Sequence, residues 1–594
     1  MNSLSVSGKN WVFKKYSNED ILFFKENFSI DEITAKLLAI RNIKKEDISS
    51  FLNPSIKNFL PNPNNLIDME KSSLRTIRSI KNNDKIGIFG DYDVDGATST
   101  ALLGKYFREL NLSFEIYIPD RKAEGYGPSI KGFKTLIDKG VKIIFTVDCG
   151  TLSFDAIEYA KNNNIDVIVL DHHQSEIKLP KAYSIVNPNR IDDKSLLQYL
   201  CAAGVSFMFL VSMNKELRLI NWFKDNSINE PNLINYLDLV SLGTVCDVVP
   251  LVGLNRAIVK QGLKILKSKN NLGLRTLLDI CKVETNPTTY HLGYILGPRI
   301  NAGGRVGKCS HGANLLLNTN SKETFKLAIE LDQFNKERQI LEKDLLKSIL
   351  LESNNFSKDP VIILKGNNWH EGIIGIVAAR LKDKFNKPTI IISIDGNVGK
   401  ASARSIVGFD IGSAIIAAAQ EKILLKGGGH KMAGGFSIDV AQIDKFKDFI
   451  IRKFKNINED LTQVKPLYLD STIAPTAINL EFFDKVNLLA PFGSGNPEPR
   501  FIVENLKPVN SKVVGDKHIK SILIGPEGSS IKTIAFNALD NELAPYLLKK
   551  NNKLFNIAGK LSLNEWRGQK NVEFIIDDIS VNKKHKNTVP SSIG

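Results

Sequence analysis

Three near-continuous apolar runs, each followed by an acidic turn and a helical pattern, occur before residue 180. They cover residues 86–90, 141–147 and 165–170. Apolar strands that alternate with helices are typical of a parallel sheet covered on both faces. In open parallel sheets, ligands bind at the carboxyl ends of the strands. The pattern therefore predicts an α/β domain whose acidic turns meet at one edge of the sheet.

Acidic side chains follow all three runs directly. In chain order they are Asp91, Asp93 and Asp95, then Asp148, then Asp171-His172-His173. Like charges packed this tightly destabilise a fold unless a cation or protons offset them. Taken singly, Asp148 is typical of a turn or a helix cap. Jointly, these residues predict a metal site.

A fourth acid, Asp247, ends another apolar segment, residues 241–246. Carboxylates with one or two imidazoles suit manganese or magnesium, whereas zinc and iron–sulfur sites usually recruit thiolates. The sequence has no paired CxxC motif. About five such groups can hold two ions roughly 3.5–4 Å apart with one carboxylate bridging them, an arrangement in which a metal-bound water attacks phosphorus. The predicted chemistry is therefore hydrolysis of a phosphate ester.

Two segments of the chain begin like other known metal-binding motifs, an EF-hand and a zinc protease, but neither segment completes its motif. An EF-hand also begins D-x-D-x-D-G, but it requires a Glu at loop position 12, where this chain has Leu102, and a helix before the loop. A solvated acidic turn would be favoured only if the cluster stood alone. His370-Glu371 could begin a zinc-protease motif, but Ile374 replaces the second histidine, so we reject that interpretation.

Helical patterns flank the predicted sheet domain. Residues 18–52 are predicted to form two or three short helices, with a capping box at Ser29 to Glu32. From Asn320 to Asn354, a pattern without Gly or Pro predicts one helix of about 50 Å. Its heptads are imperfect, so we interpret it as a rigid connector between domains and not as a coiled coil.

Two further domains are predicted after this connector. Apolar runs at 360–364 and 388–392 enclose a helix near 372–385, which predicts a second α/β domain. In the C-terminal part, short alternating runs separated by turn residues favour a small antiparallel barrel. These runs are 501–503, 521–524, 531–536 and 572–576. Trp566-Arg567 is either a stacking platform for nucleic acid or part of the barrel core.

Size and charge narrow the class of protein. The 594 residues suggest about four domains, and 43% hydrophobic with 24% charged residues is ordinary for a globular protein. A net charge of +15 suits a polyanionic substrate, and a lysine-rich solvated surface explains it equally well. No run approaches about 18 apolar residues and the start of the chain is charged, so we expect a cytoplasmic protein without signal peptide or membrane span. Five scattered cysteines fit reduced thiols.

Taken together, the motifs resemble those of the DHH phosphoesterases. The resemblance rests on Asp171-His172-His173 and on the acids at 91–95, 148 and 247. It continues through PRINAGGR (298–305), SARS (402–405), GGHKMAGG (428–435) and PFGSGNPEP (491–499). Agreement in order and spacing over nearly the whole chain is more specific than any single motif.

The resemblance implies an α/β fold in which a parallel-sheet DHH domain is joined by a long helix to a second α/β domain of the DHHA1 type, followed by a β-barrel OB-fold. OB-folds commonly bind single strands through basic grooves and aromatic platforms. The predicted division is an N-terminal helical segment (1–65), the DHH catalytic domain (66–265), a helical connector (266–355), the DHHA1 substrate-binding domain (356–455), the OB-fold (465–582) and a disordered tail (583–594).

The same resemblance implies a set of metal ligands. They are Asp93, Asp95, Asp148, His172 and Asp247, with Asp148 bridging the ions. Ser99 fits the hydroxyl position of the family's first motif. Asp91 is either a further ligand or a supporting group, and His173 either contacts the scissile phosphate or orients a ligand. Many relatives carry a histidine where this chain has Phe89, which leaves one ion with fewer protein ligands.

Substrate contacts are implied in the same way. Guanidinium groups bind phosphate in a fork that lysine cannot reproduce. The resemblance places the 5′-phosphate on Ser402 and Arg404, and a phosphate near the scissile bond on Arg299. The other implied contacts are Arg121, Tyr126, Asn301, Arg305, Gly429 and His430. Gly428-Gly429-His430 lacks the end of a P-loop, which leaves either a close backbone approach to DNA or a plain glycine turn.

By resemblance, the chain is expected to be a processive exonuclease that needs Mn²⁺ or Mg²⁺ and degrades single-stranded DNA from its 5′ end to mononucleotides. A monomeric state, a role in repair and recombination, and a single-strand-binding protein and a helicase as partners are expected as well. One alternative is a phosphodiesterase for short oligonucleotides or dinucleotides, whose rate would not depend on substrate length. Another is a non-catalytic scaffold that binds single strands, although all the carboxylates are present here.

Overall fold

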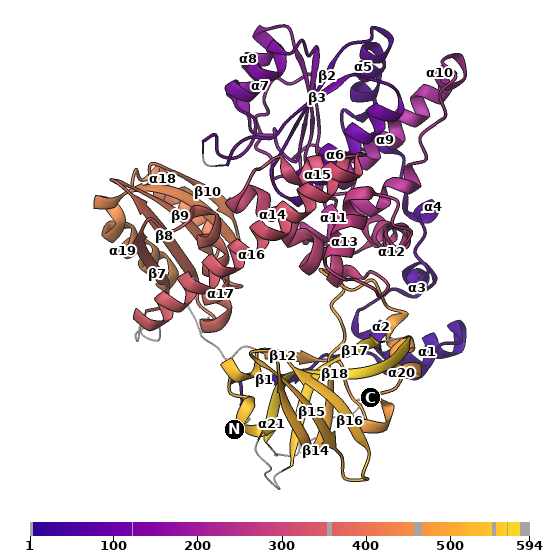
Figure 1. The fold of residues 1–594 in the computed structure, drawn as a ribbon, viewed down its shortest axis with the longest axis vertical. Helices are drawn as coiled ribbons and strands as arrows, with labels where there is room; N and C mark the ends of the chain where they lie inside the picture. Colours follow the sequence, from indigo (N-terminus) through magenta and orange to yellow (C-terminus); the bar gives the residue numbers. More distant parts are fainter. Residues whose placement is uncertain are drawn as a thin grey trace. The chain divides into compact units, whose positions relative to one another are not determined.

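The apolar runs form the predicted parallel sheet, which contains β2 and β3 (Figure 1). It has five strands in the order β3-β2-β4-β5-β6. The strands are β2 (Ile86–Gly90), β3 (Phe114–Tyr117), β4 (Ile143–Val147), β5 (Asp166–Leu170) and β6 (Ser184–Val186), all parallel. Every residue of β2 and β4 is buried, which explains why their sequences are apolar except for Thr146. Helices α7 (Ile130–Asp138) and α8 (Phe154–Asn162) share a core with one face of the sheet.

This computed structural model describes residues 4–121, 123–352, 359–456, 466–548, 554–566 and 568–581. The chain divides into two compact units, residues 60–463 and residues 1–59 with 464–594. The predictions for Arg567 and for the tail 583–594 fall outside the described residues, as does the side chain of Trp566. None of the helices in the described part of the chain combines the length and apolar character that a membrane crossing needs.

The other face of the parallel sheet is packed against α5 (Met69–Lys81), α6 (Val94–Glu109) and α9 (Ala202–Leu219). A helical layer follows in the sequence. It consists of α11 (Leu237–Cys246), α12 (Gly253–Lys267), α13 (Leu272–Ile280), the π-helical turn η4 (His291–Leu296), α14 (Gly297–Val306) and α15 (His311–Leu317). The predicted long helix is α16 (Ser321–Glu352), and the Asn320 side chain caps it by accepting from the backbone N–H groups of Lys322 and Glu323.

The second predicted α/β domain contains a mixed five-stranded sheet in the order β10-β11-β9-β8-β7. Its strands are β7 (Ile362–Asn367), β8 (Thr389–Asp395), β9 (Val398–Arg404), β10 (Lys426–His430) and β11 (Ala433–Asp439). Only β7 and β8 are parallel, and α17 (Glu371–Phe385) connects them as predicted. One face shares a core with α17 and the end of α16, and the other with α18 (Ile411–Gln420) and α19 (Ile443–Lys455).

The C-terminal barrel is present and closes through pairing of its first and fourth long strands. Its long strands are β14 (Phe501–Val514), β15 (His518–Ile524), β16 (Ser530–Ala535), β17 (Phe555–Trp566) and β18 (Gln569–Val581). The N-terminal segment packs on this barrel, because β1 (Asn10–Phe13) pairs with β12 (Pro466–Leu469). Its helices α1 (Asn18–Phe28), α2 (Glu32–Ile40) and α3 (Ile48–Leu52) share the barrel's hydrophobic core.

One local prediction, the capping box at Ser29, is wrong, and the open alternative at residues 428–430 is now decided. Ser29 does not cap α2; it ends α1 in a left-handed conformation, and Asp31 caps α2 by accepting from the backbone N–H groups of Ile33 and Thr34. Because Ser29 already ends α1, the cap of α2 is Asp31, the residue directly before Glu32. Residues 428–430 are not a tight turn, since they belong to the edge strand β10.

Candidate active site

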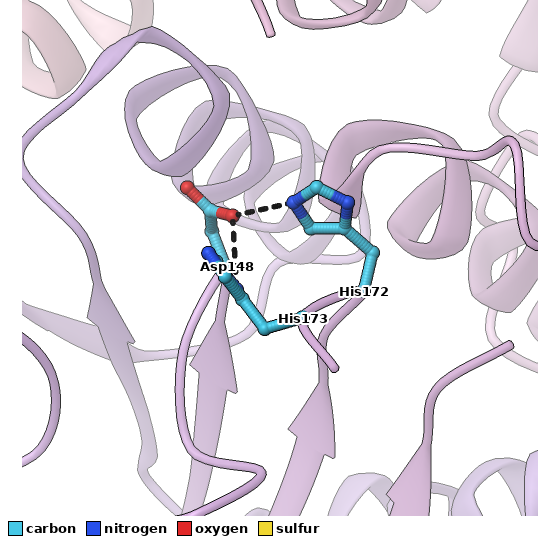
Figure 2. A group of neighbouring side chains, drawn as sticks. All are labelled: Asp148, His172 and His173. Carbon is cyan, nitrogen blue, oxygen red and sulfur yellow. Dashed lines mark ion pairs between the residues drawn. The ribbon is translucent and has the colours of Figure 1, made fainter. Parts of the chain in front are cut away.

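Asp148 and two histidines face one another at the carboxyl edge of the parallel sheet (Figure 2). Asp148 follows β4, and His172 and His173 follow the neighbouring strand β5. Asp148 Oδ1 lies 3.3 Å from His172 Nε2 and 4.0 Å from His173 Nδ1. Asp148 has a φ of 61°, in the left-handed region that Asp and Asn tolerate best among non-glycine residues.

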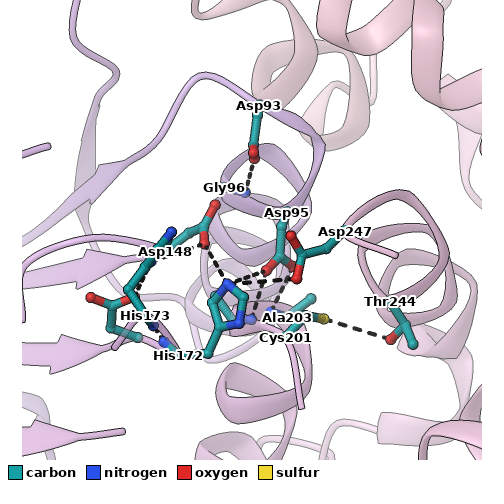
Figure 3. Close-up of polar contacts among 12 residues, drawn as sticks. Asp93, Asp95, Gly96, Asp148, His172, His173, Cys201, Ala203, Thr244 and Asp247 are labelled. Atoms are coloured by element: carbon teal, nitrogen blue, oxygen red, sulfur yellow. Dashed lines mark hydrogen bonds and ion pairs between the residues drawn. The ribbon is translucent and has the colours of Figure 1, made fainter. Parts of the chain in front are cut away.

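Two further carboxylates reach the same imidazole nitrogen (Figure 3). His172 Nε2 lies 3.6 Å from Asp247 Oδ2 and 3.8 Å from Asp95 Oδ2. Asp247 is the C-cap residue of α11, so this acid ends a helix, whereas Asp148 ends a strand. Asp95 is buried and accepts hydrogen bonds from the first two backbone N–H groups of α9, at 2.6 and 2.9 Å.

The turn from β2 into α6 holds the three alternating acids. Asp93 is the N-cap of α6, and its carboxylate accepts a hydrogen bond from the Gly96 backbone N–H at 3.0 Å. A Cβ at Gly96 would lie 2.5 Å from the Asp91 carbonyl oxygen, so only glycine fits this tight turn. The turn thereby brings Asp91 and Asp93 close to Asp148, and Asp95 close to His172.

The potential ligand atoms form overlapping groups, each within 4.8 Å. These groups are Asp91, Asp93 and Asp148; Asp95, His172 and Asp247; and Asp148, His172 and His173. Asp148 belongs to the first and the third group, so it connects the group of three carboxylates with the group that contains both histidines. Two buried atoms, His172 Nε2 and Asp91 Oδ1, have no hydrogen-bond partner within the described part of the chain. Oxygen and nitrogen donors left unsatisfied in this way fit two adjacent divalent ions.

The electrostatics of the site agree with a bound cation. Burial, and then the charges of Asp93 and Asp95, raise the pKa of Asp148 well above its usual value. Burial and the charge of Asp95 likewise raise the pKa of Asp247 to about 8. Burial lowers the pKa of His172, which keeps its imidazole neutral and able to bind a metal. The carboxylates repel one another unless a cation offsets them.

We expect the metal-free protein to lose thermal stability as the pH rises from about 5 to 8. The folded-state pKa of Asp247 is about 8, while an unfolded Asp titrates near 4. Between these values the folded state binds more protons than the unfolded state, so the contribution is full below the lower pKa and is lost as the pH rises. Melting temperatures measured in EDTA across this range check the prediction.

Added Mn²⁺ should reverse this trend, because it binds the ionised carboxylates. The substitution Asp247→Asn should flatten the pH dependence in EDTA, which isolates the contribution of this carboxyl from that of other groups. A melting temperature in EDTA that rises with pH over the same range contradicts the prediction.

Asp171 supports the site and is not placed as a ligand. Its Oδ1 accepts from His173 Nδ1 at 2.8 Å, and its Oδ2 accepts from Thr151 Oγ1 at 2.6 Å. Burial alone would lower the pKa of His173, but the charge and hydrogen bond of Asp171 raise it to about 9. Asn187 and Asn189 hold the same turn by donating to the carbonyl oxygens of His173 and His172. These supporting roles were not predicted from the sequence, in which Asp171 stood out by its position at the end of a strand and in the Asp-His-His motif.

Tyr126 lies directly on this turn. Its hydroxyl donates to the Asp148 carbonyl oxygen at 3.0 Å, and it lies 3.1 Å from His173 Nδ1. Arg121, from the same loop, stacks on the Tyr92 ring with 5.3 Å between the guanidinium carbon and the ring centroid. The loop after β3 therefore places both residues predicted to contact a nucleotide next to the acidic cluster.

Several predicted phosphate contacts form a group of cations. Burial, and then the charge of Arg121, lower the pKa of Arg305 to about 10 and also lower the pKa of Arg404. Arg305 donates to the Gly372 carbonyl oxygen at the start of α17, and Arg404 donates to Ser402 Oγ at 3.2 Å. Such mutual repulsion between half-buried guanidinium groups is relieved when an anion binds.

The remaining predicted contacts lie on α14 and β10. Arg299 is held by Asp332 and by the Ile295 carbonyl oxygen, each at 2.8 Å. Asn301 is half-buried on the same helix. His430 lies close enough for the charge of Arg404 to lower its pKa, after the larger effect of burial. Gly429 permits close strand packing, because a Cβ there would lie 2.4 Å from the Ala433 carbonyl oxygen.

A parallel sheet with Asp-His-His at one strand end and a carboxylate cluster suited to two cations defines a phosphoesterase of the DHH class. Family models agree with this classification. The DHH family N-terminal domain matches residues 85–244, the DHHA1 domain matches 358–456 and the RecJ OB domain matches 469–578. The chain belongs to the RecJ family.

Relatives cover almost the whole chain. The single-stranded-DNA-specific exonuclease RecJ of Escherichia coli is 34% identical over 561 residues, which are 92% of this chain and 95% of that protein. The crystal structure of RecJ with Mn²⁺ from Thermus thermophilus matches with a TM-score of 0.79 and 25% identity, over 97% of this chain and 80% of that one. The structure with Mg²⁺ from the same organism matches with a TM-score of 0.73, 25% identity, and coverage of 97% and 79%.

Proposed function

We propose that this chain is a metal-dependent exonuclease that hydrolyses single-stranded DNA from its 5′ end to mononucleotides. The observation that carries the proposal is the meeting of Asp95, Asp148 and Asp247 within 3.8 Å of His172 Nε2, in a chain of the RecJ family. The Escherichia coli relative is named as an exonuclease specific for single-stranded DNA, and the Thermus thermophilus structures hold Mn²⁺ or Mg²⁺. Mn²⁺ and Mg²⁺ are the matching cofactors of this chain.

The proposed metal ligands divide into two sets, and Asp148 of the first set lies 3.3 Å from His172 of the second. Asp91, Asp93 and Asp148 form one set, and Asp95, His172 and Asp247 form the other. When bound, the two ions would supply an activated water and offset the charge that builds on the phosphate oxygens. The backbone N–H groups of α9 fix the orientation of Asp95, and Asp171 keeps His173 positively charged beside Asp148.

The proposed substrate contacts explain the size of the product. Ser402 and Arg404 on β9 would bind the 5′-phosphate, and Gly429 and His430 lie on β10, with β11 between the two strands. Arg299, Asn301 and Arg305 would bind phosphates near the scissile bond, and Arg121 with Tyr126 would bind the first nucleotide. If these contacts hold the chain end one nucleotide away from the metal centre, each cleavage yields a mononucleotide.

The proposal also covers the oligomeric state, the cellular setting, the partners and the domain boundaries of the enzyme. We propose that the enzyme acts as a monomer in the cytoplasm, during DNA repair and recombination, on strands supplied by a helicase and covered by a single-strand-binding protein. The domain boundaries at residues 65, 265, 355 and 455 are part of the same proposal, with the OB-fold at 465–582 as an additional surface for the strand.

Digestion of oligonucleotides labelled at either end, with Mn²⁺ or Mg²⁺, tests the function. We expect rapid release of a 5′ label from a single strand, slow attack on duplex DNA, and a rate that increases with substrate length. The purified Asp148→Ala variant, run in parallel, controls for a contaminating nuclease. Attack from the 3′ end, equal rates on duplex DNA, or full activity of the variant would each overturn the proposal.

A further inference from the structure

Two tyrosines are exposed on the helix that carries Arg299. Tyr290 and Tyr294 are 58% and 71% exposed, and their rings stack with centroids 5.3 Å apart and an interplanar angle of 25°. A stacked pair presents a flat apolar face whose polarisable rings favour a further ring on top. Single exposed aromatic residues are common on protein surfaces, but a fixed pair is a ready binding surface.

The turn that carries this tyrosine pair packs against the helix that leads to Asp247. Tyr294 belongs to the π-helical turn η4, and Tyr290 directly precedes it. The turn packs against the end of α11 that carries Asp247, where Cys246 Sγ donates to the Leu292 carbonyl oxygen at 3.4 Å. A π-helical turn is a rare distortion that frequently occurs at functional sites.

One cation lies on the continuation of the same helix, and a second reaches it from α16. Arg299 follows Tyr294 by roughly 7.5 Å along the helix axis. Its Nε donates to Asp332, and Asp332 also pairs with Lys336 at 2.7 Å. One carboxylate facing two cations leaves a net positive charge, and this charge suits the phosphates of a strand whose bases lie on the tyrosines.

We infer that Tyr290 and Tyr294 form a stacking platform for bases of single-stranded DNA on the 3′ side of the scissile phosphate, an inference that rests on the proposed function. The 5′ end is assigned to Ser402 and Arg404 in the second sheet, so bases that reach η4 follow the scissile phosphate. Every base has an aromatic face, so such a platform binds strands of any sequence. It strengthens the binding of long strands and is not reached by the shortest ones.

Steady-state kinetics on oligo-dT of different lengths tests the platform. In the Tyr290→Ala/Tyr294→Ala double variant, the KM for a strand of about 16 nucleotides should rise on the order of 10-fold. The kcat, and the KM for a trinucleotide, should stay as in the wild type. The double Tyr→Phe variant keeps the rings and should keep the wild-type KM. Phe325→Ala, which removes an aromatic side chain exposed on α16, is the matched control.

A direct binding measurement complements the kinetics. The fluorescence of 2-aminopurine is measured with the base analogue placed at successive positions of the strand. At downstream positions it should be quenched by the wild type and by the double Tyr→Phe variant. The Tyr290→Ala/Tyr294→Ala variant should not quench it. If the Tyr290→Ala/Tyr294→Ala variant has the wild-type KM for long strands, the platform is refuted. A change in the oligomeric mass of this variant also refutes it, because the tyrosine pair would then be a contact between protein chains. Absence of 5′ digestion by the wild type would instead refute the proposed function.

Discussion

Replacing Asp148 with asparagine should lower exonuclease turnover by about a thousandfold and should make the metal-free protein more stable. Asparagine fits the left-handed backbone at this position and keeps the shape of the side chain. It removes the negative charge that lies between the two proposed ion sites, which forfeits about 4 kcal/mol of transition-state stabilisation. The rate of 5′-label release at saturating Mn²⁺ measures this loss.

The gain in stability has a separate cause. Burial and the neighbouring carboxylates Asp93 and Asp95 raise the pKa of Asp148, so its ionised form is unfavourable in the metal-free fold. A neutral amide removes that repulsion, and the melting temperature in EDTA should rise. Added Mn²⁺ should raise the melting temperature of the wild type and have less effect on the variant.

Asp155→Asn is a matched control, because Asp155 is an exposed acid on α8 outside the cluster. It should leave both the turnover and the response to Mn²⁺ unchanged. An Asp148→Asn variant that keeps wild-type turnover, or that melts at a lower temperature in EDTA, contradicts the proposed bridging role.

The central strands of the parallel sheet could be predicted from sequence, because burial on both faces leaves an unbroken apolar signal. The two edge strands carry a weaker signal. All four residues of β3 are only half-buried, and β6 has only three residues. The fully buried strand β4 and the half-exposed strand β3 therefore differ in how clearly they can be recognised, although both belong to one sheet.

Tertiary pairing determined the features that local patterns could not reveal. The strand β10 contains Lys-Gly-Gly-Gly-His, which has little intrinsic strand preference, and its pairing with β11 overrides that composition. The N-terminal helices share a core with a barrel that begins more than 400 residues later, and no short-range pattern records such a contact.

The part of the candidate site that lies at strand ends could be predicted from the sequence. Acids at the ends of parallel strands converge because the sheet aligns those ends, so Asp148 and His172 were expected to meet. The same rule does not distinguish a ligand from a support. Asp171 occupies an equivalent strand end, yet its carboxylate is used by His173 and Thr151. Roles that depend on side-chain hydrogen bonds are not readable from spacing.

Replacing Arg404 with alanine should make the enzyme nearly indifferent to a 5′-phosphate. The guanidinium is held by Ser402 Oγ and the Ala403 carbonyl oxygen and is repelled by Arg121, so it is fixed in place and gains from an anion. Hydrogen bonds between charged groups contribute about 1.5–3 kcal/mol each, so kcat/KM on a 5′-phosphorylated strand should fall roughly 10- to 150-fold. On a 5′-hydroxyl strand, which offers no terminal phosphate, the change should be small.

Two further variants separate the geometry of Arg404 from its charge. Arg404→Lys retains the charge but not the planar fork, so it should recover only part of the lost kcat/KM. Arg452→Ala removes an exposed arginine from α19 in the same domain and should affect both substrates little. An equal fall on phosphorylated and hydroxyl ends would assign Arg404 to an internal phosphate and not to the chain end. The ratio of the two kcat/KM values therefore decides whether the DHHA1-type domain selects the 5′ terminus.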